Sequence, residues 1–272
     1  MERVDGAARI VFARRGARTA VADLYQRAPC RVMFPNTDEG DVPTAALVTT
    51  SGGLTGGDRL AIEVEVGESA FATITTQAAE KIYRSPGDLC SIAVDLNIAP
   101  AAWAEWLMQE TILFDGARLS RRIEANVAEG GRLLAVESLI FGRAAMGEAF
   151  RSGSVHDGWR VKRGGRLVWM DALKLCGDVG AERAKPFGFG SAAGCATLIY
   201  VGQDAGRWLG AARDAISSSG ASGGATSFDG LMVVRLLADD AANLRRAVTS
   251  CVTRLRGEIA DLPARMPRLW SL

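Results

Sequence analysis

Apolar and polar residues alternate with a period of two over short stretches in the first part of the chain. In residues 60–66 the apolar phase consists of Leu60, Ile62, Val64 and Val66. In residues 90–98 it consists of Cys90, Ile92, Val94, Leu96 and Ile98. A helix would scatter these side chains around its axis, whereas a strand collects them on one face. The pattern therefore predicts two β-strands, ended by Gly67 and by Pro100.

Residues 159–170 predict a β-hairpin around the two-residue loop Gly164-Gly165, because tight hairpin loops need positive φ at low steric cost. The register expected from this loop opposes Trp159 with Met170, Arg160 with Trp169, Val161 with Val168, and Arg163 with Arg166. The second pair is a candidate cation–π contact. The last pair joins like charges, so we expect the tip of the hairpin to lie in water.

The end of the chain has a different character. Residues 217–230 are rich in serine and glycine and predict a flexible loop, and residues 231–237 predict a buried strand. Asp239 or Asp240 can cap a following helix, which Pro263 stops. The apolar positions of this helix are Ala241, Leu244, Val248, Cys251, Leu255 and Ile259. They form one stripe, which we expect to pack on the chain's own sheet, with a partner protein as the alternative.

Composition and charge narrow the functional classes. The 272 residues can bury a substantial core, either as one large all-β domain or as two smaller ones. The 32 basic and 31 acidic residues nearly cancel, which argues against a nucleic-acid-binding protein. The first residues carry carboxylates and no apolar core of a signal peptide. No uncharged apolar run approaches the roughly 18 residues of a membrane helix, so we expect no membrane association.

The five cysteines are scattered and never spaced C-x-x-C. This argues against a disulfide framework and a zinc site, and it suits the reducing cytoplasm. We expect each cysteine to be a buried apolar thiol. With a single histidine, His156, the sequence predicts no tight metal site, although carboxylates can still coordinate an ion weakly and transiently.

Two glycine-rich stretches fail as nucleotide sites. Gly52 to Gly57 has the spacing of a phosphate-binding loop, but Asp58 stands where the lysine is required and would repel phosphate. Residues 188–193 precede a strand rather than a helix, which is the wrong order for a dinucleotide site. His156, beside Ser154 and Asp157, is no catalytic triad, because neighbours on an extended chain point apart.

Three blocks of sequence are distinctive in combination. They are Ser51–Arg59 (SGGLTGGDR), Thr75–Ser85 (TTQAAEKIYRS) and Glu105–Leu119 (EWLMQETILFDGARL). Further matching stretches are Phe141–Glu148 (FGRAAMGE) and Pro267–Trp270 (PRLW). In this order they resemble the urease accessory protein UreD family, called UreH in some organisms.

The resemblance implies a mainly β fold of layered sheets wound in a right-handed helical manner, with a few helices near the C-terminus. It implies a single UreD-like domain over residues 1–272: strand-rich to residue 202, a helix and the Ser/Gly-rich loop over 203–230, and a strand plus amphipathic helix over 231–262. The implied function is a non-catalytic scaffold and metallochaperone. Such a protein binds the accessory protein UreF, through it the GTPase UreG, and apo-urease, and nickel passes only transiently.

The matched blocks also suggest residue roles. The candidates for an interior ion route are Asp58, Glu110, Asp115 and Glu148. The candidates for partner contacts are Lys81, Tyr83, Arg84 and Arg143, because Tyr and Arg are favoured at interface centres. The alternative is that the carboxylates cap turns or pair with these cations. We expect Gly52, Gly53, Gly56 and Gly57 to permit positive φ in a tight connection rather than to touch a ligand.

Two other functions stay open on the residues alone. Carboxylate pairs such as Glu110 and Asp115 could serve a carbohydrate-active enzyme on a β-scaffold. A β-structured interaction module without any relation to metals is the other. No G-x-S-x-G nucleophile motif or comparable catalytic signature favours an enzyme.

Overall fold

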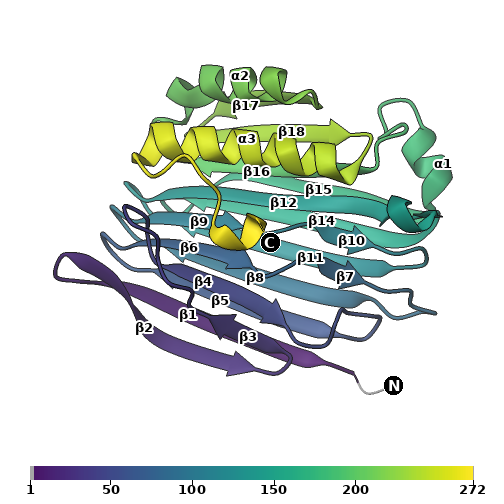
Figure 1. Ribbon diagram of the computed structural model, residues 1–272, viewed down its shortest axis with the longest axis horizontal. Helices are drawn as coiled ribbons and strands as arrows, with labels where there is room; N and C mark the ends of the chain where they lie inside the picture. The colour runs from purple at the N-terminus through teal and green to yellow at the C-terminus, as the bar shows by residue number, and fades with distance from the viewer. Residues whose placement is uncertain (1–2, 272) are drawn as a thin grey trace.

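Two β-sheets make up most of the computed structural model, which describes residues 3–271 (Figure 1). Sheet A consists of β1 (Asp5–Arg15), β2 (Arg18–Arg27), β5 (Arg59–Val66), β8 (Cys90–Ile98), β11 (Arg118–Val127), β14 (Ser152–Arg163) and β15 (Arg166–Asp178). Its order is β15-β14-β11-β8-β5-β1-β2.

Sheet B is longer. Its main strands are β3 (Cys30–Met33), β4 (Thr44–Thr49), β6 (Phe71–Thr76), β9 (Trp103–Leu107), β12 (Arg132–Arg143), β16 (Gly194–Val201), β17 (Ser222–Phe228) and β18 (Leu231–Ala238). They run in the order β17-β18-β16-β12-β9-β6-β4-β3. Beside them lie the short strands β7 (Glu80–Ile82), β10 (Thr111–Leu113) and β13 (Glu148–Ala149).

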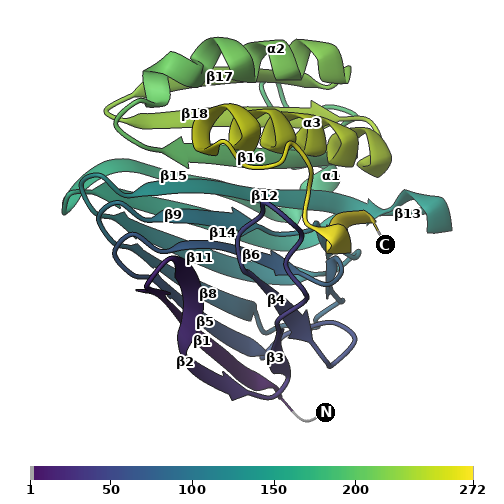
Figure 2. The same ribbon diagram turned by 60° about the vertical axis from the view of Figure 1, so that its left-hand side comes forward.

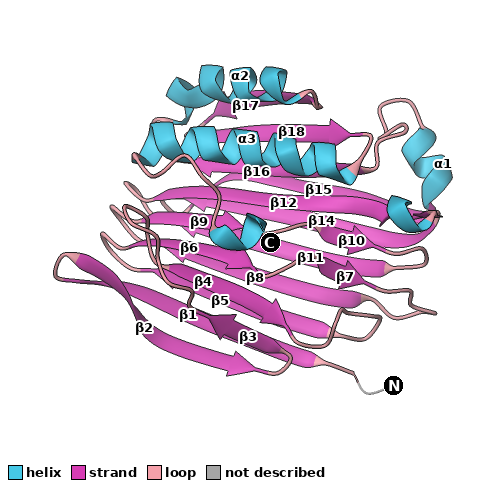
Figure 3. Ribbon diagram, viewed as in Figure 1, coloured by secondary structure: helices cyan, strands magenta, loops and turns pink. Residues whose placement is uncertain are grey.

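The helices follow late in the chain (Figure 3). They are α1 (Val179–Ala184), α2 (Leu209–Ser219) and α3 (Ala241–Ala260), with the 3₁₀ turns η1 (Ala144–Met146), η2 (Ala205–Trp208) and η3 (Arg268–Ser271). In Figure 2, α2 and α3 lie together against the end of sheet B. Among residues 3–271, no helix has the length and apolar character that crossing a bilayer requires.

The chain alternates between the sheets as it winds. It passes through β5, β8, β11 and β14 in sheet A, and through β6, β9 and β12 in sheet B. Each strand pairs in parallel with the equivalent strand of the next coil. This arrangement is a β-solenoid, and the mainly β, layered and wound fold implied by the resemblance is confirmed.

The predicted strands over 60–66 and 90–98 are β5 and β8. Their inward-facing side chains join one apolar core between the sheets, where Val64 and Leu96 are fully buried. A second core lies between sheet B and the helices. The two cores share sheet B, which is why β12 is buried along nearly its whole length.

The hairpin of β14 and β15 turns at Gly164-Gly165, as predicted, and Arg163 opposes Arg166. The rest of the expected register is wrong by one residue, because a β-bulge follows Val161. Val161 therefore opposes Trp169, and the other observed pairs are Trp159 with Asp171 and Arg160 with Met170. Trp169 instead faces the guanidinium of Arg235 at 5.9 Å.

The prediction of a flexible loop over 217–230 is wrong. Residues up to Ser219 belong to α2, and Ser222–Phe228 forms β17. This strand pairs with β18 along its length, because β18 would otherwise leave its backbone groups unpaired beside α2. At Gly223 a Cβ would come within 2.5 Å of the Arg235 carbonyl oxygen, so close pairing requires this glycine.

The predicted helix is α3, and its side chains Leu244, Val248, Cys251, Leu255 and Ile259 are buried. They pack on sheet B and α2, so the expectation of packing within the chain is confirmed. Ala241, at the start of the stripe, is exposed. The helix ends at Ala260, where Asp261 adopts the left-handed conformation before Pro263.

Arg256 anchors α3 to the beginning of the chain. Its guanidinium is almost fully buried and binds Glu105 of β9 at 2.9 Å and Asp41 of an early loop at 2.6 Å. It also donates to the carbonyl oxygens of Pro263 and Arg265. One side chain therefore joins the N-terminal loop, sheet B, the last helix and the C-terminal tail.

Three cysteines, Cys30, Cys90 and Cys251, are buried as expected, and Cys195 is partly buried. Cys176 is exposed, which contradicts the expectation, because it lies on the outer face of the edge strand β15. His156 is exposed while its neighbour Asp157 is buried, so the two point to opposite faces of β14.

We expect Asp240→Ala to lower the free energy of unfolding by about 1 kcal/mol, because the Asp240 carboxylate accepts the Asn243 backbone N–H at 2.7 Å and caps α3. Asp239→Ala is the matched control and should change it by less than about 0.5 kcal/mol. Urea titration of both variants measures the difference. Equal losses would contradict the assignment of Asp240 as the cap.

Candidate functional site

Asp58 is a turn residue in this structure. Its carboxylate is buried, 3% exposed, and accepts hydrogen bonds from the backbone N–H groups of Val4 at 2.9 Å and Thr55 at 2.7 Å. These bonds tie the N-terminal segment to the glycine-rich loop. Both carboxylate oxygens are therefore occupied by the fold itself.

Glu110 and Asp115 flank β10 but have separate partners. Glu110 binds Arg245 of α3, with a closest distance of 2.8 Å. Asp115 accepts the backbone N–H groups of Arg151 and Ser152, each at 2.9 Å. Desolvation is the largest single effect on the pKa of Asp115 and raises it, but the hydrogen bonds to this carboxylate together outweigh desolvation and hold the pKa below its usual value.

Glu148 belongs to a group of side chains around Phe114. It binds Arg143 at 2.5 Å, and the Arg143 guanidinium lies 4.1 Å from the centre of the Phe114 ring. Tyr83 meets the same ring edge-on at 4.7 Å. The structure thus brings together two predicted partner contacts, Tyr83 and Arg143, with one predicted ion-route residue.

The four carboxylates predicted for an ion route do not form a cluster. Within the described residues, no hydrogen bond or ion pair joins any two of Asp58, Glu110, Asp115 and Glu148. Their role in ion passage stays a prediction.

The remaining predicted partner contacts lie beside the glycine-rich loop. Lys81 and Arg84 are exposed, and Tyr83 is 37% exposed. The Tyr83 hydroxyl donates to the Gly52 carbonyl oxygen at 2.9 Å. Lys81, Tyr83 and the loop therefore share one face of the molecule.

The glycine-rich loop serves the backbone, as expected, but for two different reasons. Gly52, Gly53 and Gly57 have positive φ values of 74°, 145° and 91°. Gly56 does not. A Cβ at Gly56 would come within 1.9 Å of the Ser85 hydroxyl oxygen, so close approach of two segments requires glycine there.

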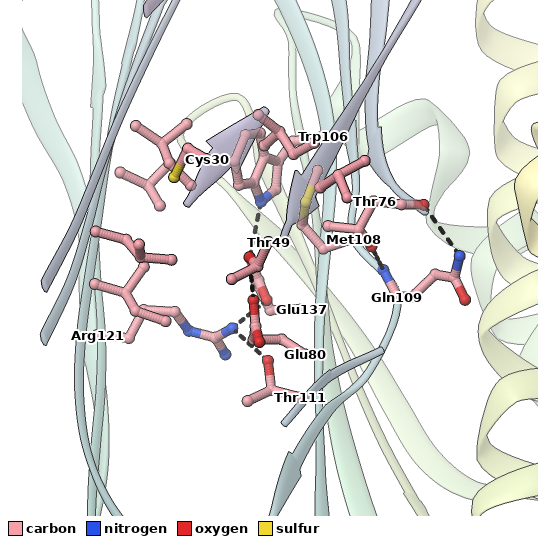
Figure 4. Close-up of a pocket in the computed structure, with 16 residues that line it drawn as sticks. Cys30, Thr49, Thr76, Glu80, Trp106, Met108, Gln109, Thr111, Arg121 and Glu137 are labelled. Carbon is pink, nitrogen blue, oxygen red and sulfur yellow. Dashed lines mark hydrogen bonds and ion pairs between the residues drawn. The ribbon is translucent and has the colours of Figure 1, made fainter. Parts of the chain in front are cut away.

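An interior cavity of about 60 Å³ lies between the two sheets (Figure 4). Such a space holds on the order of a few water molecules. Its wall is mostly apolar, and its charged lining residues are Glu80, Arg121 and Glu137. Thr49, Thr76, Thr111 and Gln109 add polar atoms.

Glu80 connects this cavity with the surface. It lines the interior cavity and also a surface pocket of about 140 Å³, which Gly52, Gly53 and Lys81 border. Thr49 donates its hydroxyl to the Glu80 carboxylate at 2.6 Å. Desolvation raises the pKa of Glu80 above its usual value, although the Thr49 bond opposes this. A carboxylate therefore stands between the glycine-rich loop and the interior.

Arg121 is a buried charged group of the cavity. It binds Asp157 with two hydrogen bonds of 2.8 and 2.7 Å, donates to Thr111 at 3.1 Å, and pairs with Glu137. The other oxygen of Glu137 accepts the Trp106 indole N–H at 2.8 Å. The cluster joins sheet A, which carries Arg121 and Asp157, to sheet B, which carries Glu137 and Trp106.

One guanidinium faces two carboxylates here, so a fully ionised cluster carries a surplus negative charge. Arg121 and Asp157 form the bidentate pair, which is the stronger geometry. Burial, with repulsion from Asp157, raises the pKa of Glu137 to about 7 despite its bonds to Arg121 and Trp106. Glu137 is therefore the group that takes up a proton when the cluster becomes neutral.

The sequence contains a signal for these buried charges. Arg121 and Asp157 occupy the inward phase of alternating strands, between Leu119 and Ile123 and between Val155 and Trp159. Glu137 interrupts the apolar run of β12. A charge at an inward position is costly unless it is paired, so each such residue predicts a buried partner.

Comparison with known proteins covers the chain almost completely. The family model described as UreD urease accessory protein matches residues 4–271. The chain belongs to the UreD family of urease accessory proteins. The UreD protein of Methylobacterium sp. (strain 4-46) is 44% identical over 94% of this chain and 90% of its own length.

Other UreD relatives also match this chain along nearly its whole length. The protein of Magnetococcus marinus is 42% identical over 99% of this chain and 94% of its own. That of Rhizobium leguminosarum bv. viciae is 36% identical over 100% of this chain and 96% of its own. These relatives are accessory proteins, so the prediction that the chain is not an enzyme is confirmed, and its role lies in urease maturation.

The interior of this UreD family member should make its stability depend on pH. Glu137 has a pKa of about 7 when folded and 4.5 in the reference state, so the folded chain binds more protons between these values. The contribution of Glu137 to the free energy of unfolding therefore falls as pH rises from about 4.5 to about 7. Glu137→Gln lacks this contribution.

We expect the stability of the native chain, minus that of Glu137→Gln, to decrease between about pH 5 and about pH 7.5 in urea titrations. Glu129→Gln, at an exposed position, is the control and should track the native chain at both pH values. A difference that stays constant across this range would show that Glu137 does not titrate there.

Proposed function

We propose that the chain is a non-catalytic scaffold of urease maturation that acts in the cytoplasm. It binds a UreF-like accessory protein, through it a UreG-like GTPase, and apo-urease, so that nickel reaches the urease active site. The observation that carries this proposal is the match to the UreD family over residues 4–271. Since the match spans the entire solenoid, the role belongs to the whole fold rather than to one motif.

Nickel is the cargo of this assembly, and the geometry supports an interior path for it. The surface pocket beside Gly52 and Lys81 meets the interior cavity at Glu80, and Glu137 lies farther inside. Carboxylates spaced along a path hold a cation loosely, which suits an ion that must leave as readily as it enters. We propose that Glu80 and Glu137 act in sequence on this path.

The path through the cavity differs from the route proposed on the sequence alone. Neither the cavity nor the surface pocket is lined by Asp58, Glu110, Asp115 or Glu148, whereas Glu80 lines both. Among the described residues, Glu80 accepts hydrogen bonds only from the Thr49 hydroxyl and the Lys81 backbone N–H, so no ion pair there compensates its charge. The two routes make different predictions for substitution.

The partner surface is proposed to include Lys81, Tyr83, Arg84 and Arg143. Tyr83 and Arg143 pack on Phe114, which holds both side chains in place before binding. Such preorganised aromatic and arginine side chains lose little entropy in an interface. Nearby in sequence, Met146 of η1 is 73% exposed and adds apolar contact area.

Glu80→Gln should lower the nickel content and activity of urease several-fold when the variant replaces the native chain in urease-producing cells. The change removes the negative charge at the entrance of the cavity but keeps the side-chain shape. Nickel per urease molecule, measured by atomic absorption, is the readout, and Glu129→Gln is the control. If Asp115→Asn and Glu148→Gln reduce loading while Glu80→Gln does not, the cavity path is wrong.

Tyr83→Ala and Arg84→Ala should each weaken binding of the UreF-like partner or of apo-urease by about thirtyfold, equivalent to about 2 kcal/mol. Tyr25→Ala and Arg18→Ala, at exposed positions of β2, are matched controls. Copurification and titration with each purified partner measure the effect. Unchanged binding of both partners would remove these residues from the interface.

A further inference from the structure

The end of the solenoid opposite β2 and β3 finishes with two unpaired sheet edges. Across residues 3–271, β15 pairs only with β14, and β17 pairs only with β18. Each therefore presents a row of free backbone N–H and C=O groups on its outer side.

Sheet B extends past sheet A at this end. Both views show β18 and β17 continuing beyond the level of β15 (Figures 1 and 2). The side of β17 turned toward α2 is covered by that helix, whereas Gly224, Thr226 and Phe228 on the opposite side are exposed. Sheet A therefore lacks a strand that would cover this side of β17.

An open groove of about 440 Å³ occupies the position of that strand. Trp169 of β15 forms one wall, and Phe228, Thr226 and Gly224 of β17 form the floor with Val233 and Arg235 of β18. Phe228 is 40% exposed. The groove is thus an apolar shelf beside a free strand edge.

The edge of β15 offers a long and regular stretch of backbone. Ten consecutive residues, Trp169–Asp178, pair regularly with β14 beyond the bulge. On its outer face lie Met170, Ala172, Lys174 and Cys176, all exposed. Lys174 is the charge of this outer face, while Asp171 pairs with Arg235 and Asp178 caps α1.

We propose that β15 is a docking edge for one extended segment of another protein, which adds to sheet A as its next strand and covers β17. Backbone hydrogen bonds to β15 would hold it, and every second side chain would enter the groove. Alternate apolar residues suit the floor around Phe228 and Val233.

The outward residues of the segment are acidic. The outer face of the hairpin carries Arg160 and Lys174, and His156 lies opposite Lys174. Asp157 and Asp171 point inward, toward Arg121 and Arg235. Acidic side chains alternating with apolar ones therefore match both faces of the vacant position.

A second copy of the chain does not fit this edge. Two β15 strands paired antiparallel are related by a two-fold axis perpendicular to the sheet, which puts both B sheets on the same side. Because each sheet B overhangs its own β15, the two overhangs would occupy the same space. A lone extended segment avoids this clash.

The probe for a test is a fluorescent peptide of about eight residues in which valine and glutamate alternate, the length of an ordinary strand. Controls are the alternating valine–lysine peptide and a peptide with the valines and glutamates in two blocks. Fluorescence anisotropy with the full chain measures affinity, and hydrogen exchange reports where the peptide pairs. We expect binding of the alternating acidic peptide alone, with slower exchange in residues 166–178 and no change in β2.

Gly224→Trp supplies the blocking variant. A Cβ at Gly224 meets no atom within 4 Å, and Gly224 lines the groove, so a tryptophan there is placed to occupy it. Gly87→Trp is the matched control, since Gly87 is equally open and lies elsewhere. We expect Gly224→Trp to lower the affinity for the alternating acidic peptide by at least about tenfold and Gly87→Trp to lower it by less than about twofold. Lys174→Glu should also weaken it and should favour the valine–lysine peptide.

Four results would overturn the proposal. They are no binding at millimolar peptide, equal effects of the two tryptophan variants, protection at β2 instead of β15, and dimers in sedimentation that Gly224→Trp dissociates. The last result would assign the edge to a second copy. None of these measurements involves nickel or urease, so they do not bear on the role in urease maturation.

Discussion

The ion cluster around Arg121 is the contact on which the two-layer arrangement depends. It lies in an otherwise apolar interior and joins both sheets, since Arg121 and Asp157 come from sheet A and Glu137 and Trp106 from sheet B. Apolar packing alone allows two sheets to slide over one another, because it has little direction. A buried guanidinium with fixed partners permits one registration, since any displacement leaves a charge unpaired in a medium of low polarity. The cavity exists beside this cluster because polar groups held by one another cannot also fill the space.

The fold was predictable from the sequence where local pattern and tertiary structure agree. The strands over 60–66 and 90–98 and the helix after Asp240 follow from periodicity and capping, which depend on neighbours in the chain. The winding came from the resemblance alone, because alternation is the same in a sandwich and in a solenoid. The predicted pairing of β14 with β15 was wrong beyond one β-bulge, because composition does not reveal where a bulge lies. The prediction of a loop in place of β17 was wrong because the serines and glycines favour a loop locally. Only pairing with β18 makes this segment a strand.

The candidate functional residues also fall into two groups, those that motif matching found and those that only the fold brings together. Motif matching pointed to Asp58 and to the glycine loop, which the structure uses to hold segments together. The charged residues that line the interior space, Glu80, Arg121 and Glu137, come from three different strands. Their proximity arises from stacking of successive coils, so they are recognised as neighbours only in the folded chain. The inward phase of Arg121 indicated a buried partner, but not which one.

The contacts of Arg256 have a consequence for how the chain is made. Asp41 leaves the ribosome more than two hundred positions before the arginine that it binds, since the two are separated by 215 residues. During synthesis the coils can stack in order, yet the early loop and the face of sheet B under α3 remain without their final partner until the last helix is released. The apolar face of sheet B that α3 covers therefore stays exposed until the end of translation. Aggregation competes with folding during that interval, whatever the stability of the finished solenoid.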